Sequence, residues 1–371
     1  MTAFLDSEYA DLINTTFPSR KRTTWDEQVR TLQNYHVMSR IITRKNIRQR
    51  SGRSIQFNAR FFSADQAEMV KIRQRADPFS KDMHALGSVP WRELRSSCIY
   101  DEQIIDENSG ADEQLVDYMV SIENDSEGAT AELLETQFFQ GPTSLVDEES
   151  AYGLPVWVTK GTGTSFSFES VDPSYVTGGA GGFAAATYPN WRSGFSQYVN
   201  RDDDDLYYKM RVGLLKTGFN PPVAGPYSND THEQTKAGYY TPKGPDREFI
   251  TTMDVLLDME QQARTQNENL RNELNMFAGE VTFFRAPVTW SAWLQENANA
   301  TANSSLHGID PIYCLDWNVW EVTVLKGNLF KKTPAMRHPD YPRTWQKFTF
   351  LRFNFSCRSR RNNFQLSKAN T

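Results

Sequence analysis

Side chains that could perform chemistry are present, but their spacing matches no catalytic or metal-binding pattern. The histidines form no HxH pair, no HExxH motif and no pair at i, i+4. The cysteines form no CxxC motif and lack zinc-site spacing. We therefore expect satisfied or exposed histidines, separate thiols in a reducing compartment, and no bound metal or cofactor. The residues concerned are His36, His84, His232, His307, His338, Cys98, Cys314 and Cys357.

Glycine-rich and acidic stretches could form a phosphate loop or a cation site, but each is incomplete. "GTGTSF" at 161–166 lacks the third glycine of a dinucleotide loop, and "GGAGGF" at 178–183 lacks the Lys-Ser/Thr of a phosphate loop. The Asp202–Asp205 run could hold a metal, but negative charge also suits a helix start, which we expect here. The many carboxylates leave a catalytic pair open, yet nothing singles one out. We predict no enzymatic activity.

Composition narrows the class of protein further. The 371 residues carry a net charge of −6, which does not indicate a general nucleic-acid binder. No apolar run approaches the ~20 residues that a membrane helix needs, and the first residues do not resemble a secretory signal. We expect a protein of two or three domains, or one elaborate domain, without a membrane partner.

The charged residues are arranged in two blocks of opposite sign. A basic block without any acid runs from Arg40 to Arg53, and every charged residue from Asp101 to Glu149 is an acid. The blocks are either two solvated faces or surfaces that attract each other, within a subunit or between neighbours. As a third alternative, the basic block contacts phosphates. The candidate inter-subunit contacts are Arg40, Arg44, Lys45, Arg48, Arg50, Arg53, Asp101, Glu102, Asp106, Glu107, Asp112, Glu113 and Asp117.

The elements that would position these blocks can be read from hydrophobic spacing. After a mixed N-terminal stretch, residues 24–47 are predicted to be helical. Alternation in "SGRSIQFNARFFS" indicates a half-exposed strand, and residues 51–105 are predicted to form one long hairpin with little core of its own. Such a protrusion is expected to lie on something else.

A long acidic helix is predicted over residues 112–140, ending at Gly141 and Pro142. Its apolar residues fall on one stripe, and its other faces are acidic. The stripe consists of Leu115, Met119, Ile122, Ala129 and Leu133.

The rest of the chain mixes strands and helices. Residues 153–170 are predicted to be strand-like, and a helical region is predicted to begin at residue 191. Residues 248–270 are predicted to form a strand and then a helix. Further strands are expected within 280–290, 310–327 and 345–366, where Phe353, Phe355 and Cys357 alternate with polar residues.

This order of elements resembles the major capsid proteins of tailed bacteriophages, which have the Hong Kong 97 fold. The local sequences that carry the resemblance are "LLETQFFQG" and "GLPVWV" after the acidic stretch, then "PNWRSGFSQYV", "FITTMDVLLDME", "PIYCLDW" and "FTFLRFNFSCRSRR". The resemblance implies a mixed α+β fold in five parts. These are an N-terminal arm with a short helix (1–50), an extended loop (51–105), a peripheral domain (106–184) with spine helix 112–140, an axial domain (185–320), and return strands of the peripheral domain (321–371).

The resemblance also implies a structural function. The chain is expected to assemble with copies of itself into hexamers and pentamers of an icosahedral head that encloses double-stranded DNA. It implies a separate scaffolding protein, a portal, non-specific DNA contact on the inner face, and assembly in the host cytoplasm into a virion capsid; a decoration protein stays open. Covalent crosslinking is not implied, because Lys71 and Lys81 lie in the loop without a matching asparagine. The alternatives are an encapsulin-like shell, a soluble carboxylate- or metal-dependent enzyme, and a nucleic-acid-binding module.

Overall fold

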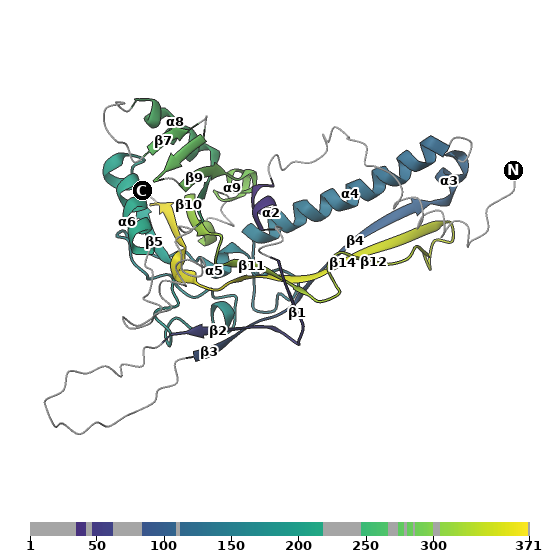
Figure 1. The fold of residues 1–371 in the computed structure, drawn as a ribbon, viewed down its shortest axis with the longest axis horizontal. Helices are drawn as coiled ribbons and strands as arrows, with labels where there is room; N and C mark the ends of the chain where they lie inside the picture. Colours follow the sequence, from purple (N-terminus) through teal and green to yellow (C-terminus); the bar gives the residue numbers. More distant parts are fainter. Residues whose placement is uncertain are drawn as a thin grey trace, which may run out of the picture.

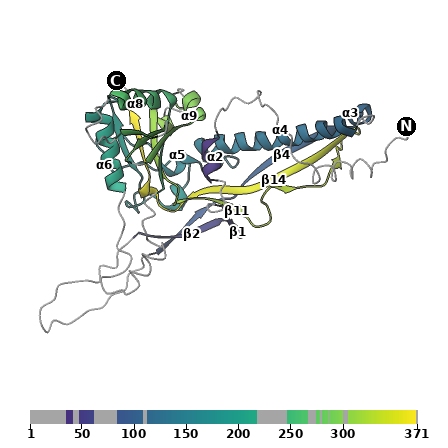
Figure 2. The same cartoon turned by 45° about the horizontal axis from the view of Figure 1, so that its top comes forward.

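The part of the chain that the structure describes forms two sheets, a separate hairpin and one long helix (Figure 1). The computed structural model describes residues 35–41, 47–61, 84–108, 112–217, 246–265, 274–277, 280–284, 286–299 and 305–369. The long helix extends to one side with two long strands beside it, and the helices and strands of the second sheet gather at the other end (Figures 1 and 2). In this part of the chain no helix has the length and apolar character needed to cross a membrane.

The first sheet has six strands arranged around one very long strand, β14 (Thr344–Cys357). One part of β14, Thr344–Phe353, pairs antiparallel with β4, and Phe353–Cys357 pairs with β11. Two short strands also pair with β14, and β1 pairs parallel with β11. The other strands are β1 (Ile47–Arg50), β4 (Arg92–Asp101), β11 (Trp320–Leu325), β12 (Lys331–Lys332) and β13 (Met336–Arg337).

Helix α4 (Asp112–Phe139) confirms the predicted long helix almost residue for residue. Its 28 residues span about 42 Å, and Gly128 does not interrupt it. A short helix, α3 (Glu102–Asn108), precedes it and connects it to β4. Together α3, α4, β4, β12, β13 and Thr344–Phe353 form a two-layered part that we call the plate.

The buried stripe of α4 differs from the predicted stripe. Met119 is buried as expected, but Leu133 is 43% exposed. The buried line instead continues through Ser126, Thr130 and Leu134 at a spacing of four residues. The sequence pattern missed this line because two of its members are polar: the Ser126 hydroxyl is hydrogen-bonded to that of Ser96 on β4 at 2.7 Å, and Thr130 Oγ1 donates to the Ser126 carbonyl.

The second sheet has seven strands in the order β5-β15-β10-β6-β9-β8-β7. Its strands are β5 (Gly194–Tyr198), β6 (Arg247–Thr251), β7 (Leu274–Phe277), β8 (Glu280–Phe283), β9 (Ala286–Trp290), β10 (Ile309–Asp316) and β15 (Phe364–Lys368). Helices α6 (Tyr208–Thr217) and α8 (Met253–Thr265) pack on one face through Met210 and Met259. The other face joins the central core, in which Phe139 of α4 stacks on Trp293 of α9 (Ala292–Asn297) at 5.5 Å.

The predicted hairpin is shorter than 51–105. β2 (Ile55–Arg60) pairs with β3 (His84–Val89) as a separate two-stranded sheet. The following strand, β4, was predicted to belong to this hairpin, but it pairs with β14 over ten residues. Its Leu94, Cys98 and Tyr100 are buried, so this strand belongs to the plate.

Other predicted elements also differ from the observed helices and strands. Residues 153–170 contain a short helix, α5 (Leu154–Trp157), rather than a strand, and the region from residue 191 begins with β5 before a helix forms. Within the described part of the predicted helix 24–47, only α2 (His36–Ile41) is helical, and Ile47 begins β1. The return strands 321–371 divide between the two sheets, because β15 lies between β5 and β10.

Candidate assembly surfaces

The basic block has partners within the chain. Arg40 Nε lies 3.4 Å from Glu248 Oε2, and Arg48 Nε lies 3.2 Å from Glu321 Oε1. An Arg50 guanidinium nitrogen donates to the Gln56 carbonyl, and Arg53 is exposed in the turn before β2. Arg44 and Lys45 lie outside the described residues.

The acidic block lies on α3 and the first turns of α4. Asp101 Oδ1 accepts a hydrogen bond from the Gln103 amide at 3.0 Å, Glu102 Oε1 lies 3.5 Å from Arg337 Nη2, and Asp106 is exposed. Glu107 lies on α3, and Asp112, Glu113 and Asp117 lie in the first turns of α4.

Among the described residues, the fold does not bring the two blocks together within one chain. β1, which carries Arg48 and Arg50, lies near the middle of the molecule, whereas α3 lies at the far end of α4 (Figures 1 and 2). Two acids further along α4 have cationic partners instead: Lys332 of β12 pairs with Glu123 and lies 3.5 Å from Glu127, and Lys347 of β14 lies 3.9 Å from Glu123. These partners were missed because they lie about 200 residues from α4 in the sequence.

The plate is covered by α4 on one face. Cys98, Tyr100 and Trp345 form a small core with Met119 of α4 on that face. By the strand register, the opposite face, which we call the outer sheet face, carries Ile99, Met336, Phe348 and Phe350. Ile99 is 55% exposed and Met336 is 44% exposed. Apolar residues gathered on an open sheet face are typical of a surface that a partner covers.

The base of the hairpin is anchored in an aromatic cluster, which contradicts the expectation that it has little core. Phe57 lies 5.9 Å from Phe183 and 6.1 Å from Trp191, measured between ring centroids. Phe61 lies 4.5 Å from Tyr188. The hairpin is therefore fixed to its own chain at its base.

The glycine-rich loop 178–183 completes this anchor. Its 3₁₀ turn, η1 (Ala180–Gly182), contains Gly181 at φ +70, a conformation that favours glycine. A Cβ on Gly181 would lie 2.9 Å from the Phe57 ring, so only glycine allows this close approach. The loop thus packs against the hairpin.

A buried arginine connects the end of the first sheet to this anchor. Arg360, in the 3₁₀ turn η3 (Arg360–Asn362) between β14 and β15, is fully buried. It donates to the Trp157 carbonyl at 2.7 Å, the Trp191 carbonyl at 3.0 Å and Thr159 Oγ1 at 3.1 Å. Burial lowers the pKa of its guanidinium to about 10, so the group is still charged at neutral pH. Both tryptophans that it binds lie against the Phe57 ring, Trp157 at 6.4 Å and Trp191 at 6.1 Å between ring centroids, so Arg360 holds both sides of the aromatic cluster.

Helix α2 is held between two buried carboxylates. Glu135 of α4 accepts hydrogen bonds from the Val37 and Met38 amides at 3.3 and 2.8 Å, and Glu248 of β6 contacts His36 and Arg40. Burial raises the pKa of Glu135 to about 7, although the two amide hydrogen bonds oppose the shift. Burial also disfavours ionised Glu248, but hydrogen bonds, led by that from His36, outweigh it and lower its pKa.

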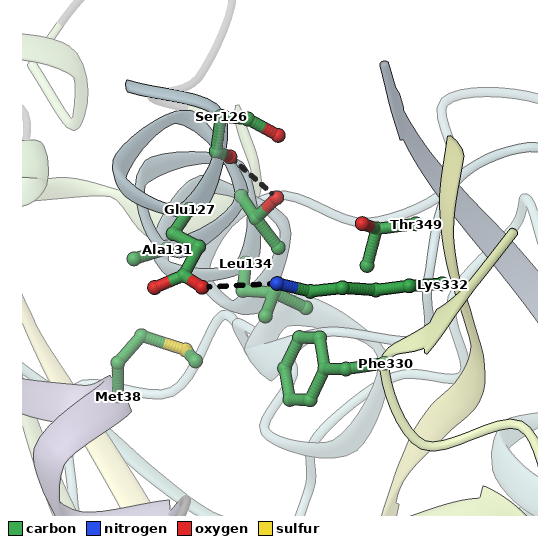
Figure 3. A pocket seen from close by; sticks show the side chains of 9 residues that line it. Met38, Ser126, Glu127, Ala131, Leu134, Phe330, Lys332 and Thr349 are labelled. Carbon is green, nitrogen blue, oxygen red and sulfur yellow. Dashed lines mark hydrogen bonds and ion pairs between the residues drawn. The ribbon is translucent and has the colours of Figure 1, made fainter. Parts of the chain in front are cut away.

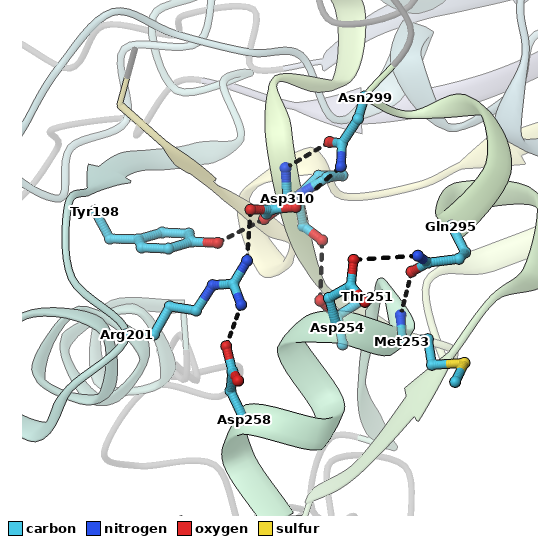
Figure 4. A network of polar contacts seen from close by, with 10 residues as sticks. Tyr198, Arg201, Thr251, Met253, Asp254, Asp258, Gln295, Asn299 and Asp310 are labelled. Carbon is cyan, nitrogen blue, oxygen red and sulfur yellow. Dashed lines mark hydrogen bonds and ion pairs between the residues drawn. The ribbon is translucent and has the colours of Figure 1, made fainter. Parts of the chain in front are cut away.

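A polar network joins the loops at one end of the seven-stranded sheet (Figure 4). Arg201 contacts Asp258 of α8 and lies 2.6 Å from Asp310 Oδ2, while Asn299 Nδ2 donates to Asp310 Oδ1 at 3.0 Å. Asp310 has a φ of +44 and its carbonyl accepts from Tyr198 Oη at 2.8 Å. Each carboxylate of the network contacts a cation or an amide, so the network can hold the adjoining loops in place.

The Asp202–Asp205 run begins a helix, as expected. Asp202 Oδ1 accepts from the Asp205 amide at 3.0 Å and caps a π-helical turn, η2 (Asp203–Tyr207), that continues into α6. Asp205 accepts from the Val199 amide at 2.6 Å and pairs with Lys209. Among the described residues, no three His, Cys, Asp or Glu side chains gather in a way that could hold a metal ion.

The three cysteines and His307 are buried in the interior of the fold. Cys98, Cys314 and Cys357 are buried free thiols, and burial raises the pKa of Cys314 and Cys357 to about 12, which disfavours the reactive thiolate. His307 Nδ1 is hydrogen-bonded to Tyr313 Oη at 2.7 Å, and burial lowers its pKa to about 4. It is neutral at physiological pH.

Comparison of the whole structure with solved structures places this geometry in a known fold. The capsid subunit of cyanophage A-1(L) matches with a TM-score of 0.56 and 11% identity, over 96% of this chain and 98% of that one. The capsid of the native GTA particle matches with a TM-score of 0.51 and 10% identity, over 95% and 96%. The capsid of Myoviridae phage XM1 matches with a TM-score of 0.51 and 8% identity, over 94% and 97%.

No protein-family model matches the chain, and a search of curated proteins found no match. The structural correspondence nevertheless extends over nearly the whole of both chains. The molecule therefore has the capsid fold of tailed phages and GTA particles, the Hong Kong 97 type, with a mixed α+β architecture. The fold predicted from the sequence is confirmed at this level.

Proposed function

We propose that this chain is the major capsid protein of an icosahedral phage or GTA head, with a structural and not a catalytic function. The near-complete correspondence with capsid subunits supports this proposal. The observation that carries it in the chain itself is the outer sheet face, where Ile99 and Met336 are exposed on a sheet covered by α4 on its other side. A plate of two layers buries little apolar area by itself, so neighbouring copies would stabilise it.

In this proposal each part of the molecule has an assembly function. The β2–β3 hairpin is the base of the extended loop, and it reaches from an anchored base onto a neighbouring subunit. The plate is the peripheral domain with α4 as its spine helix, and the seven-stranded sheet is the axial domain. Hexamers and pentamers would then need only modest contacts, because a closed symmetric shell repeats each interface many times.

Other components are part of the same proposal. A separate scaffolding protein and a portal would direct assembly in the host cytoplasm, double-stranded DNA would contact the inner face without sequence preference, and a decoration protein could bind outside. Packaged DNA and portal are also the components that distinguish a phage head from an encapsulin-like shell.

The decisive experiment is co-expression of the chain with a candidate scaffolding protein, followed by sedimentation and electron microscopy. Closed shells or capsomer-sized rings are the expected products. A compact monomer under every assembly condition would refute the capsid function. Shells that form normally but enclose protein cargo and never DNA would favour the encapsulin-like alternative.

We also propose that the basic and acidic blocks attract across a subunit boundary. Reversal of Arg48 would place a second carboxylate beside buried Glu321, so exposed Arg53 is the cleaner site for a test. Arg53→Glu should slow assembly, more strongly at low salt, and Asp106→Lys in the same chain should restore part of the rate. Unchanged kinetics at low salt would mean that the blocks are solvated faces. Normal assembly with failed DNA packaging would assign the basic block to phosphates.

A further inference from the structure

An apolar groove lies between α4 and the β12 segment, next to α2 (Figure 3). Its volume is about 370 Å³, and we call it the α4–β12 groove. Its walls include Met38, Thr130, Ala131, Leu134, Phe330 and Lys332. The lining is mostly apolar, and a smaller void below it shares Met38, Leu134 and Phe330, so the groove continues toward the core.

The groove is held open by specific contacts. Lys332, whose ammonium group pairs with Glu123 and Glu127, spans one side between β12 and α4 (Figure 3). Phe330 is 37% exposed and has a φ of +46, a backbone conformation that bulky residues rarely adopt. This conformation persists only where the surroundings impose it, and here it places an aromatic ring on the groove wall.

The described structure begins beside the groove, at the point where the N-terminal segment joins it. Residues 1–34 lie outside the described residues and join the structure at Tyr35, immediately before α2. Met38 of α2 lines the groove, and Glu135 fixes the amides of Val37 and Met38 to α4. The N-terminal segment therefore connects to the described structure at the edge of the groove.

The sequence of this segment fits an apolar groove. Leu5, Tyr9, Leu12 and Ile13 recur at i, i+4, i+7 and i+8, which is the spacing of one helical stripe. The acids Asp6 and Glu8 flank this stripe, and Asp11 falls on the far face of such a helix, where it would stay in solvent. At the rim of the groove Lys332 and Lys347 balance Glu123 and Glu127, so the rim has no excess charge that would repel the segment.

We propose that the stripe Leu5, Tyr9, Leu12 and Ile13 binds in the α4–β12 groove of its own chain. About 25 residues separate Ile13 from Met38, which is enough chain to return the first residues to the groove. Because the stripe and the groove belong to one chain, their contact is intramolecular, so a weak apolar contact is enough for occupancy. This contact does not depend on shell assembly.

Thiol crosslinking of the full chain tests the proposal. Leu12→Cys combined with Ala131→Cys places one thiol on the stripe and one in the groove, and the three native cysteines are buried. The matched control is Leu12→Cys with Ala129→Cys, because Ala129 is exposed two residues away on the same helix. With a short bismaleimide at low micromolar protein, the groove pair should give an intramolecular product at least about tenfold faster than the control.

Equal rates for the two pairs, no product, or a product that joins two chains would overturn the proposal. A second measurement fills the groove: Ala131→Phe should accelerate hydrogen exchange of residues 5–13 about tenfold, while Ala129→Phe should leave it unchanged. No acceleration in a folded Ala131→Phe protein would also overturn it. If shells form while the crosslink fails, the groove contact is wrong and the capsid function stands. If the crosslink forms but no shell ever does, the groove contact stands and the capsid function is wrong.

Discussion

Replacing Arg360 by alanine should destabilise the subunit by about 4 kcal/mol, because a buried charged group with several partners is lost. The side chain is fully buried and makes three hydrogen bonds of 2.7 to 3.1 Å, two of them to backbone carbonyls. Each bond to a charged donor contributes about 1.5–3 kcal/mol, but the three act together and do not add fully. Arg360→Lys keeps the charge but lacks the planar guanidinium that reaches all acceptors, so it should cost about 2 kcal/mol.

The assay is guanidinium unfolding of the free subunit followed by tryptophan fluorescence, since Trp157 and Trp191 accept the hydrogen bonds in question. The control is Arg361→Ala. Arg361 is exposed, bonds Asn190 at 3.0 Å and lies over the Phe168 ring at 4.5 Å, so its loss should cost under about 1 kcal/mol. Equal losses for the two variants, or a loss below about 1 kcal/mol for Arg360→Ala, would refute the argument that the buried guanidinium holds the aromatic cluster.

Three further outcomes are expected. The pKa of Glu135 is about 7 in the folded chain and 4.5 in the unfolded chain. Between these pH values the folded chain retains a proton that the unfolded chain releases, so the free energy of unfolding falls as pH rises. Glu135→Gln should remove about 3 kcal/mol of that fall, measured by urea denaturation at pH 5 and 8. Phe57→Ala should cost about 3–4 kcal/mol and expose the hairpin to exchange, whereas Leu86→Ala, at a 60% exposed residue, should cost under about 0.5 kcal/mol; equal costs would contradict the aromatic anchor. Ile99→Lys should lower the shell yield at least about tenfold without shifting the unfolding midpoint. Val146→Lys, at an 85% exposed loop residue, should leave the shell yield unchanged. Normal shells from Ile99→Lys would show that the outer sheet face is not part of an interface.

The sequence predicted those elements that depend on local patterns. Helix α4 was predicted because its residues favour helices and Gly141 and Pro142 stop it, and its bounds differ from the prediction by one residue. The strand β6 and the helix α8 were also predicted from their local sequence pattern. The Asp202–Asp205 run was correctly interpreted as a helix start because helix capping is a local interaction.

The elements that were missed depend on residues distant in the sequence. β5 is buried on both faces and pairs with β15, about 170 residues later, so it shows no alternation that would mark a strand. β4 does alternate, but the sequence does not specify which strand it pairs with, and β14 lies far away. The aromatic anchor also joins Phe57 to residues beyond 150, and these contacts have no local signature.

The candidate contact residues were predictable as charge blocks but not as contacts. Charge spacing indicated where like charges gather, yet the partners of Arg48, Arg40 and Lys332 are buried or distant acids chosen by the fold. Glu135 looked like one more surface acid on a polar helix face. Only the packing of α2 on α4 turns it into a buried acceptor.

The position of β14 determines the order in which the molecule can be completed as it is synthesised. This strand is the pairing partner of both β4 and β11, and β15 lies between β5 and β10. Roughly 240 residues separate β4 from β14, which corresponds to about 10–50 s of translation at typical rates. Throughout this interval β4 has no strand beside it and α4 has no finished sheet to cover. Unpaired strand edges of this kind associate readily with other chains, so the outer sheet face and the plate core cannot exist as defined surfaces until residue 357 has been made. The plate of a chain that is still being synthesised therefore offers no finished surface to a partner.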